Sequence, residues 1–333
     1  MRRRTFLRNS AVLGAGVGLG GFFPAGELIG ASRSRVTILH TNDTHARIEP
    51  FPDSAPRYAG MGGVARRATL INRLRAANPD SLLLDAGDVF QGTPYFNKFN
   101  GALDFEVMSK MGYDAVTIGN HEFDNEVGGF EEVMDKARFP FVSTNYDFGT
   151  TQMGLRVHKF LIKQVAGVKI GIFGLGVAFE NLVLPHLHRG VTYLDPVEVS
   201  ADTVAHLKGY HQCDMVICLS HIGYRYSSDL VSDRVVAQQV DGIDLIIGGH
   251  THTFMPEPEL FEKPDGSRTW ISQVGFAGIV LGRLDFHFDR ERRIAAMYHH
   301  HYPVADPGNA DPLKLSINSH PALSMEYRQG GIS

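Results

Sequence analysis

Short apolar runs alternate with longer segments of mixed polarity along the first half of the chain. The short runs are rich in β-branched residues, as buried strands are, and the longer segments repeat apolar residues three and four positions apart, as helices do. We expect strands over residues 35–41, 81–84, 115–118 and 141–144, and helices over residues 64–77, 103–111 and 129–137. Strands that alternate with helices predict a largely parallel sheet with both faces covered.

The pattern changes near residue 155 and then returns. Residues 155–165 and 168–173, joined at Ala166-Gly167, are expected to form a hairpin. Beyond it we expect helices over residues 196–210 and 228–240, and strands over residues 215–219, 245–247, 269–273, 279–288 and 294–301. Residues 302–333 show little periodicity and are interpreted as a C-terminal tail. We therefore predict one layered α/β domain over residues 35–301.

Composition indicates a folded protein without a nucleic-acid partner. The 333 residues are 43% hydrophobic and 20% charged, which is ample for a sizeable core. The formal net charge is −4, and residues 1–31 alone carry four Arg and one Glu, so the rest of the chain is more acidic than the total suggests. An acidic domain offers no basic surface to a phosphate backbone, and we expect no nucleic-acid partner.

The first 31 residues have the layout of an export signal. Arg2-Arg3-Arg4 precedes Thr5-Phe6-Leu7, and a weakly apolar run follows over residues 11–23. That run is shorter than the roughly 20 residues that a membrane-spanning helix needs. The arrangement resembles a twin-arginine signal peptide over residues 1–31, which implies export to a periplasmic or extracellular location and no membrane span after its removal. A basic tail without a targeting role is the alternative.

Side chains that can bind metal ions follow five of the predicted strands. They are Asp43-Thr44-His45, Gly87-Asp88, Asn120-His121, Ser220-His221 and Gly249-His250-Thr251-His252. Any one of these groups has a structural explanation, such as capping a turn. Ligands bind at the carboxyl ends of strands in open α/β sheets, so five groups at equivalent strand ends favour one shared site.

The spacing within two of the groups suits metal binding. Asp43 and His45 are two residues apart and can point the same way in an extended segment, as can His250 and His252. The second pair could straddle two ions, because paired catalytic metals lie about 3.5–4 Å apart. Carboxylate, imidazole and amide donors without thiolate suit manganese, zinc or iron. Two ions also need a shared anionic ligand, for which Asp88 is the best candidate.

Taken together, the five groups resemble the signature of the calcineurin-like metallophosphoesterases. The longer strings from His40 to His45, from Asp85 to Thr93 and from Asn120 to Asp124 are similar to the catalytic domain of bacterial 5′-nucleotidases. Over residues 35–301 the resemblance implies a four-layer α/β-β/α sandwich of two mixed sheets flanked by helices. It also implies two divalent metal ions as cofactors, whose identity the ligands leave open.

The resemblance implies a role for individual residues. One metal ion would be bound by Asp43, His45, Asp88 and His252, and the other by Asp88, Asn120, His221 and His250. His121 would not bind metal; it would face the phosphate of the substrate, with Asn120 close by. Asp124 would orient the His121 ring, since carboxylates of this kind fix the tautomer of a histidine and raise its basicity.

The implied activity is the hydrolysis of a small phosphate monoester such as a nucleotide, by hydroxide formed from a metal-activated water. Two alternative activities of the same metal site remain open, those of a cyclic-nucleotide phosphodiesterase and of a thiosulfohydrolase. A non-enzymatic metal-binding subunit is disfavoured by the presence of His121 and Asp124. The sequence shows no counterpart of the separate nucleotide-binding domain of 5′-nucleotidases, so either another chain supplies it or the substrate is a different ester.

Several other polar residues are weaker candidates. His186, His188 and the run His299-His300-His301 are interpreted as surface or strand-edge histidines. Asp85 is expected to form hydrogen bonds within the site at most. Asn42, Gly92 and Asn145 lie in strings similar to the family and have no specific role. Glu122, although it is adjacent to His121, is assigned no chemistry.

Overall fold

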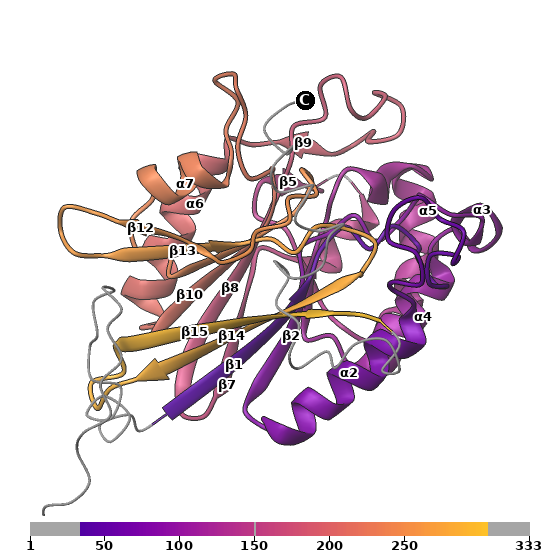
Figure 1. Cartoon of the computed structure of the whole chain (residues 1–333). Coiled ribbons are helices and arrows are strands. Elements are labelled where there is room, and N and C mark those ends of the chain that lie inside the picture. Colours follow the sequence, from indigo (N-terminus) through magenta and orange to yellow (C-terminus); the bar gives the residue numbers. More distant parts are fainter. Residues whose placement is uncertain (1–33, 150, 306–333) are drawn as a thin grey trace, which may run out of the picture.

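Two β-sheets packed against each other form the centre of the molecule (Figure 1). The computed structural model describes residues 34–149 and 151–305. The predicted signal peptide at residues 1–31 lies outside the described residues, as does the predicted tail over residues 302–333 except for residues 302–305.

The first sheet is mixed, with β1 near its middle. In the described part of the chain its order is β15 (Ile294–Pro303), β14 (Val280–Phe288), β1 (Ser34–Thr41), β2 (Ser81–Asp85), β3 (Ala115–Thr117), β4 (Phe141–Val142) and β6 (Val157–His158). Strands β1 to β6 of this sheet run parallel, whereas β14 and β15 are antiparallel. Every residue of β2 and β3 is buried, which explains why these strands are apolar without alternation.

The second sheet is also mixed. Within the described residues its order is β12 (Glu259–Glu262), β13 (Arg268–Ser272), β11 (Leu245–Gly248), β10 (Met215–His221), β8 (Val168–Gly176) and β7 (Phe160–Val165). The four middle strands are parallel, and the two edge strands are antiparallel to their neighbours. A small ribbon pairs β5 (Tyr146–Asp147) with β9 (Thr192–Tyr193).

Helices cover the outer faces of both sheets (Figure 1). The first sheet is covered by α2 (Val64–Ala77), α3 (Pro94–Phe99), α4 (Ala102–Met111) and α5 (Glu126–Val133), and the second by α6 (Pro196–Ala205) and α7 (Asp233–Gln239). The predicted period is visible in α2, whose buried Leu70, Ile71 and Leu74 pack in one cluster with Leu39 of β1. Asp195 caps α6 by accepting hydrogen bonds from the first turn, and Pro196 follows it.

The predicted four-layer sandwich of two mixed sheets flanked by helices is confirmed. A separate apolar cluster fills the space between the sheets, where Ile38 and Leu84 of the first sheet meet Ile172, Leu219 and Ile247 of the second. Side chains on the other face of each strand pack under the helices instead. The central strands of both sheets are therefore buried on both faces, and their ends remain available to a site.

The two sheets are in backbone contact at Gly174 of β8. The carbonyl oxygen of Gly174 accepts a hydrogen bond from the Thr144 backbone nitrogen at 2.7 Å. A Cβ atom on Gly174 would collide with the Val142 carbonyl oxygen and with Thr117 Oγ1. Glycine is therefore required here because backbone from one sheet touches backbone from the other.

The predicted hairpin over residues 155–165 and 168–173 is partly wrong. Residues 160–165 pair with β8 as expected, but Val157 and His158 pair with β4 in the other sheet. The chain crosses between the sheets at Lys159, whose carbonyl oxygen accepts a hydrogen bond from Thr144 Oγ1. A strand of two residues is too short to show a period, so the sequence pattern merged β6 with β7.

Other boundaries differ by a few residues. The helix expected over residues 129–137 begins at Glu126 and ends in a 3₁₀ turn at Met134–Lys136. The helix expected over residues 196–210 finishes as a π-helical turn, His206–Tyr210, and the one expected over residues 228–240 begins only at Asp233. The strand expected over residues 141–144 is shorter, and the strand expected over residues 294–301 continues to Pro303. No element was predicted where α3 and β12 lie.

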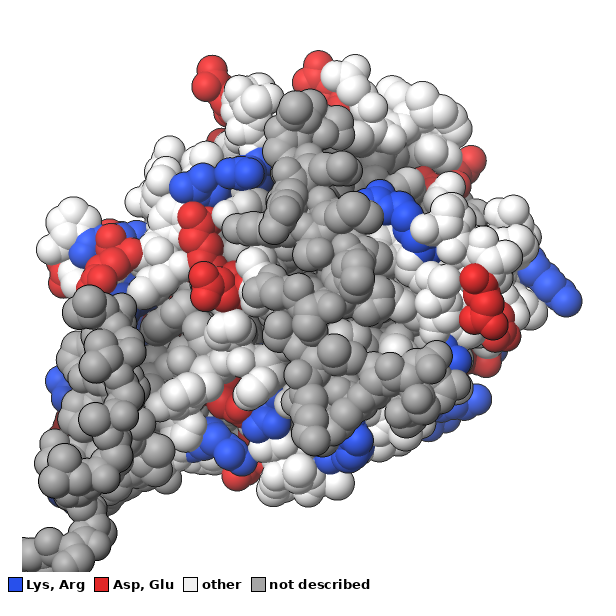
Figure 2. All heavy atoms as spheres, in the orientation of Figure 1, with Lys and Arg blue, Asp and Glu red and all other residues white. Residues whose placement is uncertain are grey.

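The surface mixes charges of both signs. On the face shown in Figure 2, acidic and basic side chains of the described residues are interspersed around the periphery. Among residues 34–149 and 151–305, each helix is too short or too polar to cross a bilayer.

We expect Gly174→Ala to lower the free energy of unfolding by about 1–3 kcal/mol, since the added methyl group overpacks a backbone contact between the sheets. Urea denaturation followed by circular dichroism measures the change. Gly209→Ala is the matched control, because nothing lies within 4 Å of a Cβ atom at that position. Equal unfolding midpoints for the two variants would contradict the close approach of the sheets at Gly174.

Candidate metal centre

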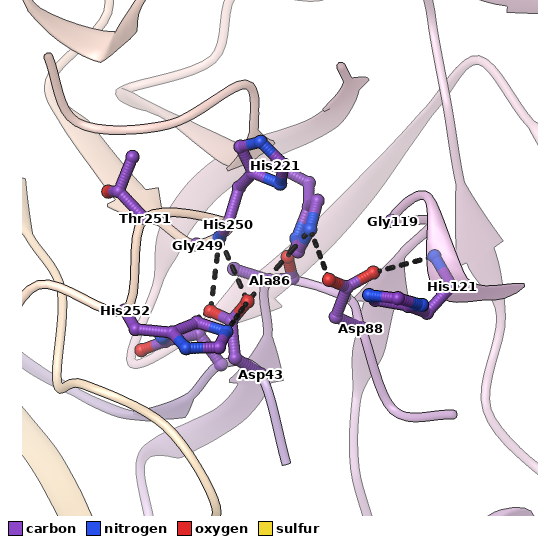
Figure 3. A network of polar contacts seen from close by, with 12 residues as sticks. Asp43, Ala86, Asp88, Gly119, His121, His221, Gly249, His250, Thr251 and His252 are labelled. Atoms are coloured by element: carbon purple, nitrogen blue, oxygen red, sulfur yellow. Dashed lines mark hydrogen bonds and ion pairs between the residues drawn. The ribbon is translucent and has the colours of Figure 1, made fainter. Parts of the chain in front are cut away.

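Strand ends from both sheets deliver the predicted side chains to one edge of the sandwich (Figure 3). In the first sheet, β1, β2 and β3 lead into Asp43, Asp88 and Asn120, respectively. In the second sheet, β10 ends on His221 and β11 leads into His250. Because these strands are parallel within each sheet, their carboxyl ends lie together, as predicted.

One group of donors consists of Asp43, His45 and His252, whose ligand atoms all lie within 4.8 Å of one another. His45 Nε2 is 2.9 Å from His252 Nε2, which in turn is 3.3 Å from Asp43 Oδ1. His45 Nδ1 lies 3.1 Å from the Phe90 carbonyl oxygen, to which it donates in the tautomer that leaves Nε2 free. The Phe276 ring stacks on His252 and holds it in place.

A second group consists of Asp88, His221 and His250, with ligand atoms equally close together. His221 Nδ1 donates to the Ala86 carbonyl oxygen at 2.7 Å, and its Nε2 lies 3.0 Å from Asp88 Oδ2 (Figure 3). Asn120 is buried, and its Oδ1 atom has no hydrogen-bond partner among the described residues. Buried polar atoms normally have partners, so this oxygen indicates a ligand.

These residues fit two divalent cations. The side chains of Asp43 and Asp88 are 0% and 2% exposed, and burying a carboxylate without a compensating charge costs several kcal/mol. The two groups adjoin, since His221 Nε2 is 3.0 Å from Asp88 and 3.9 Å from Asp43. Carboxylate oxygens, imidazole nitrogens and one amide oxygen form a donor set that suits manganese, zinc or iron.

Five residues of the two donor groups have left-handed backbone conformations, as do ten other described residues that are not glycine. Positive φ angles between 49° and 69° occur at Asp43, His45, Asp88, His250 and His252. Left-handed conformations in residues other than glycine cost about 1–3 kcal/mol each in strained cases, and they cluster at functional sites. Five strained residues with converging side chains therefore support one shared role.

The buried carboxylates and histidines shift each other's protonation. Burial alone would raise the pKa of Asp88, but the adjacent His221 lowers it below its ordinary value. Burial alone would lower the pKa of His221, yet the charges of Asp88 and Asp43 raise it to about 10. The pKa of His250 is lowered to about 4, first by burial and then by His221. Metal binding would therefore displace a proton from His221.

His121 and Asp124 form a pair beside the donor groups. His121 Nδ1 lies 2.8 Å from Asp124 Oδ2, and the His121 ring meets the His45 ring edge-on at 5.4 Å between centroids. Burial would lower the pKa of His121, but the hydrogen bond to Asp124 and the charge of Asp88 raise it to about 9. The ring is therefore protonated at neutral pH, and it can donate a hydrogen bond to an anionic oxygen.

Glu122, to which no chemistry was assigned from the sequence, is buried between the loops that carry Asp88 and Asn120. Its buried carboxylate accepts hydrogen bonds from the backbone nitrogens of Asp88, Val89, Phe90 and Gly119. Three of these partners are more than 30 residues away in sequence, and backbone nitrogens leave no trace in a pattern of side chains. The adjacency of Glu122 to His121 was the only sequence signal.

The weaker candidates divide between two kinds of contact. Asn42 Nδ2 donates to Asp43 Oδ2 at 2.6 Å, and Asp85 accepts from the Gly87 backbone nitrogen, so both support ligand loops. Asn145 instead exchanges two hydrogen bonds with the backbone of Gly176 in β8. At Gly92 a Cβ atom would lie 2.9 Å from the Cβ atom of His45, so glycine permits the close approach.

His186, His188 and the run His299-His300-His301 belong to neither donor group. His186 is exposed, and the ring of His188 stacks on Phe179 with 4.0 Å between centroids. His299, His300 and His301 lie on β15, the edge strand of the first sheet, as the strand-edge interpretation expected, although His301 itself is buried. The reason is that β15 continues past the expected end and remains packed as far as Val304.

The two mixed sheets and the paired donor groups at their edge are those of a metal-dependent phosphoester hydrolase. The chain belongs to the calcineurin-like phosphoesterase family, which it matches over residues 36–254. The resemblance found in the sequence is therefore confirmed.

Similar proteins include several whose names refer to nucleotides. The chain is 33% identical to the trifunctional nucleotide phosphoesterase YfkN of Bacillus subtilis, over 77% of the chain and 18% of that protein. It is 30% identical to the human 5′-nucleotidase, over 88% of the chain and 52% of that protein. The crystal structure of a 5′-nucleotidase precursor from Thermus thermophilus superposes with a TM-score of 0.73 at 32% identity, covering 89% of the chain and 58% of that structure. The chain spans 58% or less of each of these proteins.

Asp124→Asn is expected to lower the pKa of His121 from about 9 toward or below its ordinary value of 6.5, because burial then outweighs the remaining charges. NMR titration of the His121 ring in metal-free protein measures the shift. Asp147→Asn, which changes an exposed carboxylate, is the control. An unchanged His121 pKa in the Asp124 variant would show that the pair is not coupled.

The same pair predicts a pH dependence of stability. The folded-state pKa of His121 lies above its unfolded value, so the stability that the pair contributes is complete below pH 6.5 and is lost as the pH rises through about 9. The difference in unfolding free energy between wild type and Asp124→Asn should therefore shrink across this window. Chemical denaturation at a series of pH values measures it, and a difference that grows with pH would refute the assignment.

Proposed function

We propose that the protein is an exported phosphohydrolase that uses two divalent metal ions to cleave phosphate monoesters such as nucleotides. Family membership supports phosphoester hydrolysis, and the two adjoining donor groups support two ions. Export to a periplasmic or extracellular location is proposed from Arg2-Arg3-Arg4 and the weakly apolar run at residues 11–23.

The observation that carries the proposal is the position of His121 and Asp124 next to the donor groups. A set of ligands alone could serve a structural metal. A protonated imidazole held by a carboxylate is instead a group for hydrolysis, because it can stabilise negative charge on a reacting oxygen. The His121 backbone nitrogen also donates to Asp88 Oδ1 at 2.9 Å, which fixes the pair relative to the second donor group.

The ligands divide into two sets in this proposal. One ion is held by Asp43, His45 and His252, the other by Asn120, His221 and His250, and Asp88 is shared between them. When bound, the two ions supply Lewis acidity toward phosphoryl oxygens and an activated water. The unpaired Oδ1 of Asn120 supports its place in the second set.

His121 acts on the substrate directly in the proposed reaction. Asp124 engages Nδ1 of the ring, so Nε2 is the nitrogen left to donate a hydrogen bond to the phosphoryl or leaving oxygen. The carboxylate also raises the pKa of His121, which favours the protonated form of the ring. Asn120 lies next to His121 in sequence and is proposed to contact the phosphate with it.

A panel of esters tests the function. AMP, a cyclic nucleotide, p-nitrophenyl phosphate and a thiosulfate ester are incubated with the full chain and manganese, and the released phosphate, nucleoside monophosphate and sulfate are each measured. We expect phosphate release from the monoesters, loss of activity with a chelator and recovery with manganese. Cleavage of the cyclic nucleotide or sulfur ester alone would replace the proposed activity, and hydrolysis of none would favour a non-enzymatic role. The panel is repeated with the nucleotide-binding domain of a 5′-nucleotidase added, to test for a separate partner chain.

His121→Ala is expected to lower kcat by about 10²-fold or more while the metal content stays unchanged, because the variant loses a proton donor and no ligand. Steady-state kinetics and elemental analysis of the same preparation measure the two quantities. His186→Ala, which removes an exposed histidine, is the control. Unchanged turnover in the metal-loaded His121 variant would exclude the proposed role.

Asp88→Ala has a different expected result, which is loss of bound metal. A carboxylate shared by both ions contributes to both sites, so the purified variant should contain fewer than two ions per chain by elemental analysis. Asp147→Ala, at an exposed position, should retain the wild-type content. Two tightly bound ions in the Asp88 variant would refute the shared assignment.

A further inference from the structure

Glu122 connects the two loops that carry the proposed ligands Asp88 and Asn120. Its Oε1 accepts hydrogen bonds from the backbone nitrogens of Val89 at 2.7 Å and Phe90 at 3.2 Å. Its Oε2 accepts from the backbone nitrogen of Asp88 at 3.0 Å and from that of Gly119 at 2.6 Å. One side chain therefore holds four backbone groups, three from the loop after β2 and one from the loop after β3.

The three consecutive donors at residues 88–90 form a concave arrangement of N–H groups around one anion. Such nests commonly bind phosphate or another external anion. Here the anion is an internal carboxylate with 1% exposure, so solvent and free anions are excluded from the position. The loop after β2 is therefore organised around a fixed side chain of the protein itself.

The loop that Glu122 holds is strained and tightly packed. Gly87 and Asp88 have consecutive positive φ angles of 85° and 53°. A Cβ atom on Gly119 would lie 2.7 Å from the Asp88 backbone nitrogen, and one on Gly87 would lie 2.7 Å from the Gly119 backbone nitrogen. The loops are thus in direct backbone contact, and a shift of one must displace the other. Four hydrogen bonds to a single carboxylate offset the strain and fix this contact.

We propose that Glu122 is a positioning residue that sets the placement of Asp88 relative to Asn120 and thereby the affinity for the metal ion that these residues share. The inference rests on the proposed function, because it concerns the two ions of that function. Glu122 itself contacts no substrate: both of its oxygens are engaged by backbone nitrogens, and the side chain is buried beneath the loops. Glu122 influences metal affinity only through the positions of Asp88 and Asn120.

Glu122→Gln is the variant that isolates this role. Glutamine has nearly the same shape, but its amide nitrogen is a donor. The NH₂ group of the glutamine would then face two backbone N–H groups, from which it cannot accept hydrogen bonds. Two of the four hydrogen bonds would therefore be lost. Asp244→Asn is the matched control, because the Asp244 carboxylate also accepts a backbone hydrogen bond, from Val216 at 2.7 Å. The same carboxylate forms an ion pair with Lys208. Val216 and Asp244 lie at the opposite ends of β10 and β11 from the donor groups.

Manganese binding to the chelator-treated full chain, measured by isothermal titration calorimetry, tests the proposal. We expect wild type to bind two ions and Glu122→Gln to lose about 10–100-fold in affinity at one of them, as is usual when an outer hydrogen-bond partner of a ligand is changed. Asp244→Asn should be less stable to denaturant yet bind both ions as wild type does. Wild-type affinities in a destabilised Glu122→Gln would overturn the positioning role. Fewer than two ions on wild type would instead overturn the two-ion function itself.

Hydrogen exchange on the wild-type protein provides a test that does not depend on how the variant folds. If Glu122 positions the loops in advance of the metal, peptides containing residues 88–90 and 119 should exchange slowly in metal-free protein, and manganese should add little protection. Fast exchange of these peptides in metal-free protein, followed by strong protection on adding manganese, would show that the metal orders the loops and would overturn the proposal.

Discussion

The burial of two carboxylates at the junction of two sheets is the interaction on which the arrangement of the site depends. Asp43 and Asp88 follow neighbouring parallel strands, and each accepts a hydrogen bond from the backbone of a residue on another strand end. Asp43 thereby holds His250 of the second sheet, and Asp88 holds His121 of the first. The charge that remains buried favours cations at this edge, which is why histidines and an unpaired amide oxygen surround it.

The packing between the sheets sets the accuracy of this arrangement. Donors from the first sheet reach donors from the second only because the apolar layer between them, and the backbone contact at Gly174, fix their separation. Site geometry and core packing are thus parts of one constraint in this fold.

The sequence allowed the alternation of strands and helices to be predicted, and with it the common edge at which Asp43, Asp88 and His221 lie. Long apolar strands carry a strong signal, and residues that directly follow them are easy to place. The crossing at Lys159 was missed because β6 has too few residues to show a period. Glu122 was missed because its partners are backbone nitrogens, and any residue but proline supplies those.

The place of β1 in the first sheet has a consequence for biosynthesis. One neighbour, β2, is made soon after β1, but the other, β14, lies far along the chain, as the hydrogen bond between Thr37 and Asp285 across 248 residues shows. At typical rates of translation, one edge of β1 therefore waits on the order of tens of seconds for its partner. An open strand edge can pair with another chain, so the newly made protein exposes this edge of β1 to aggregation until β14 has been made.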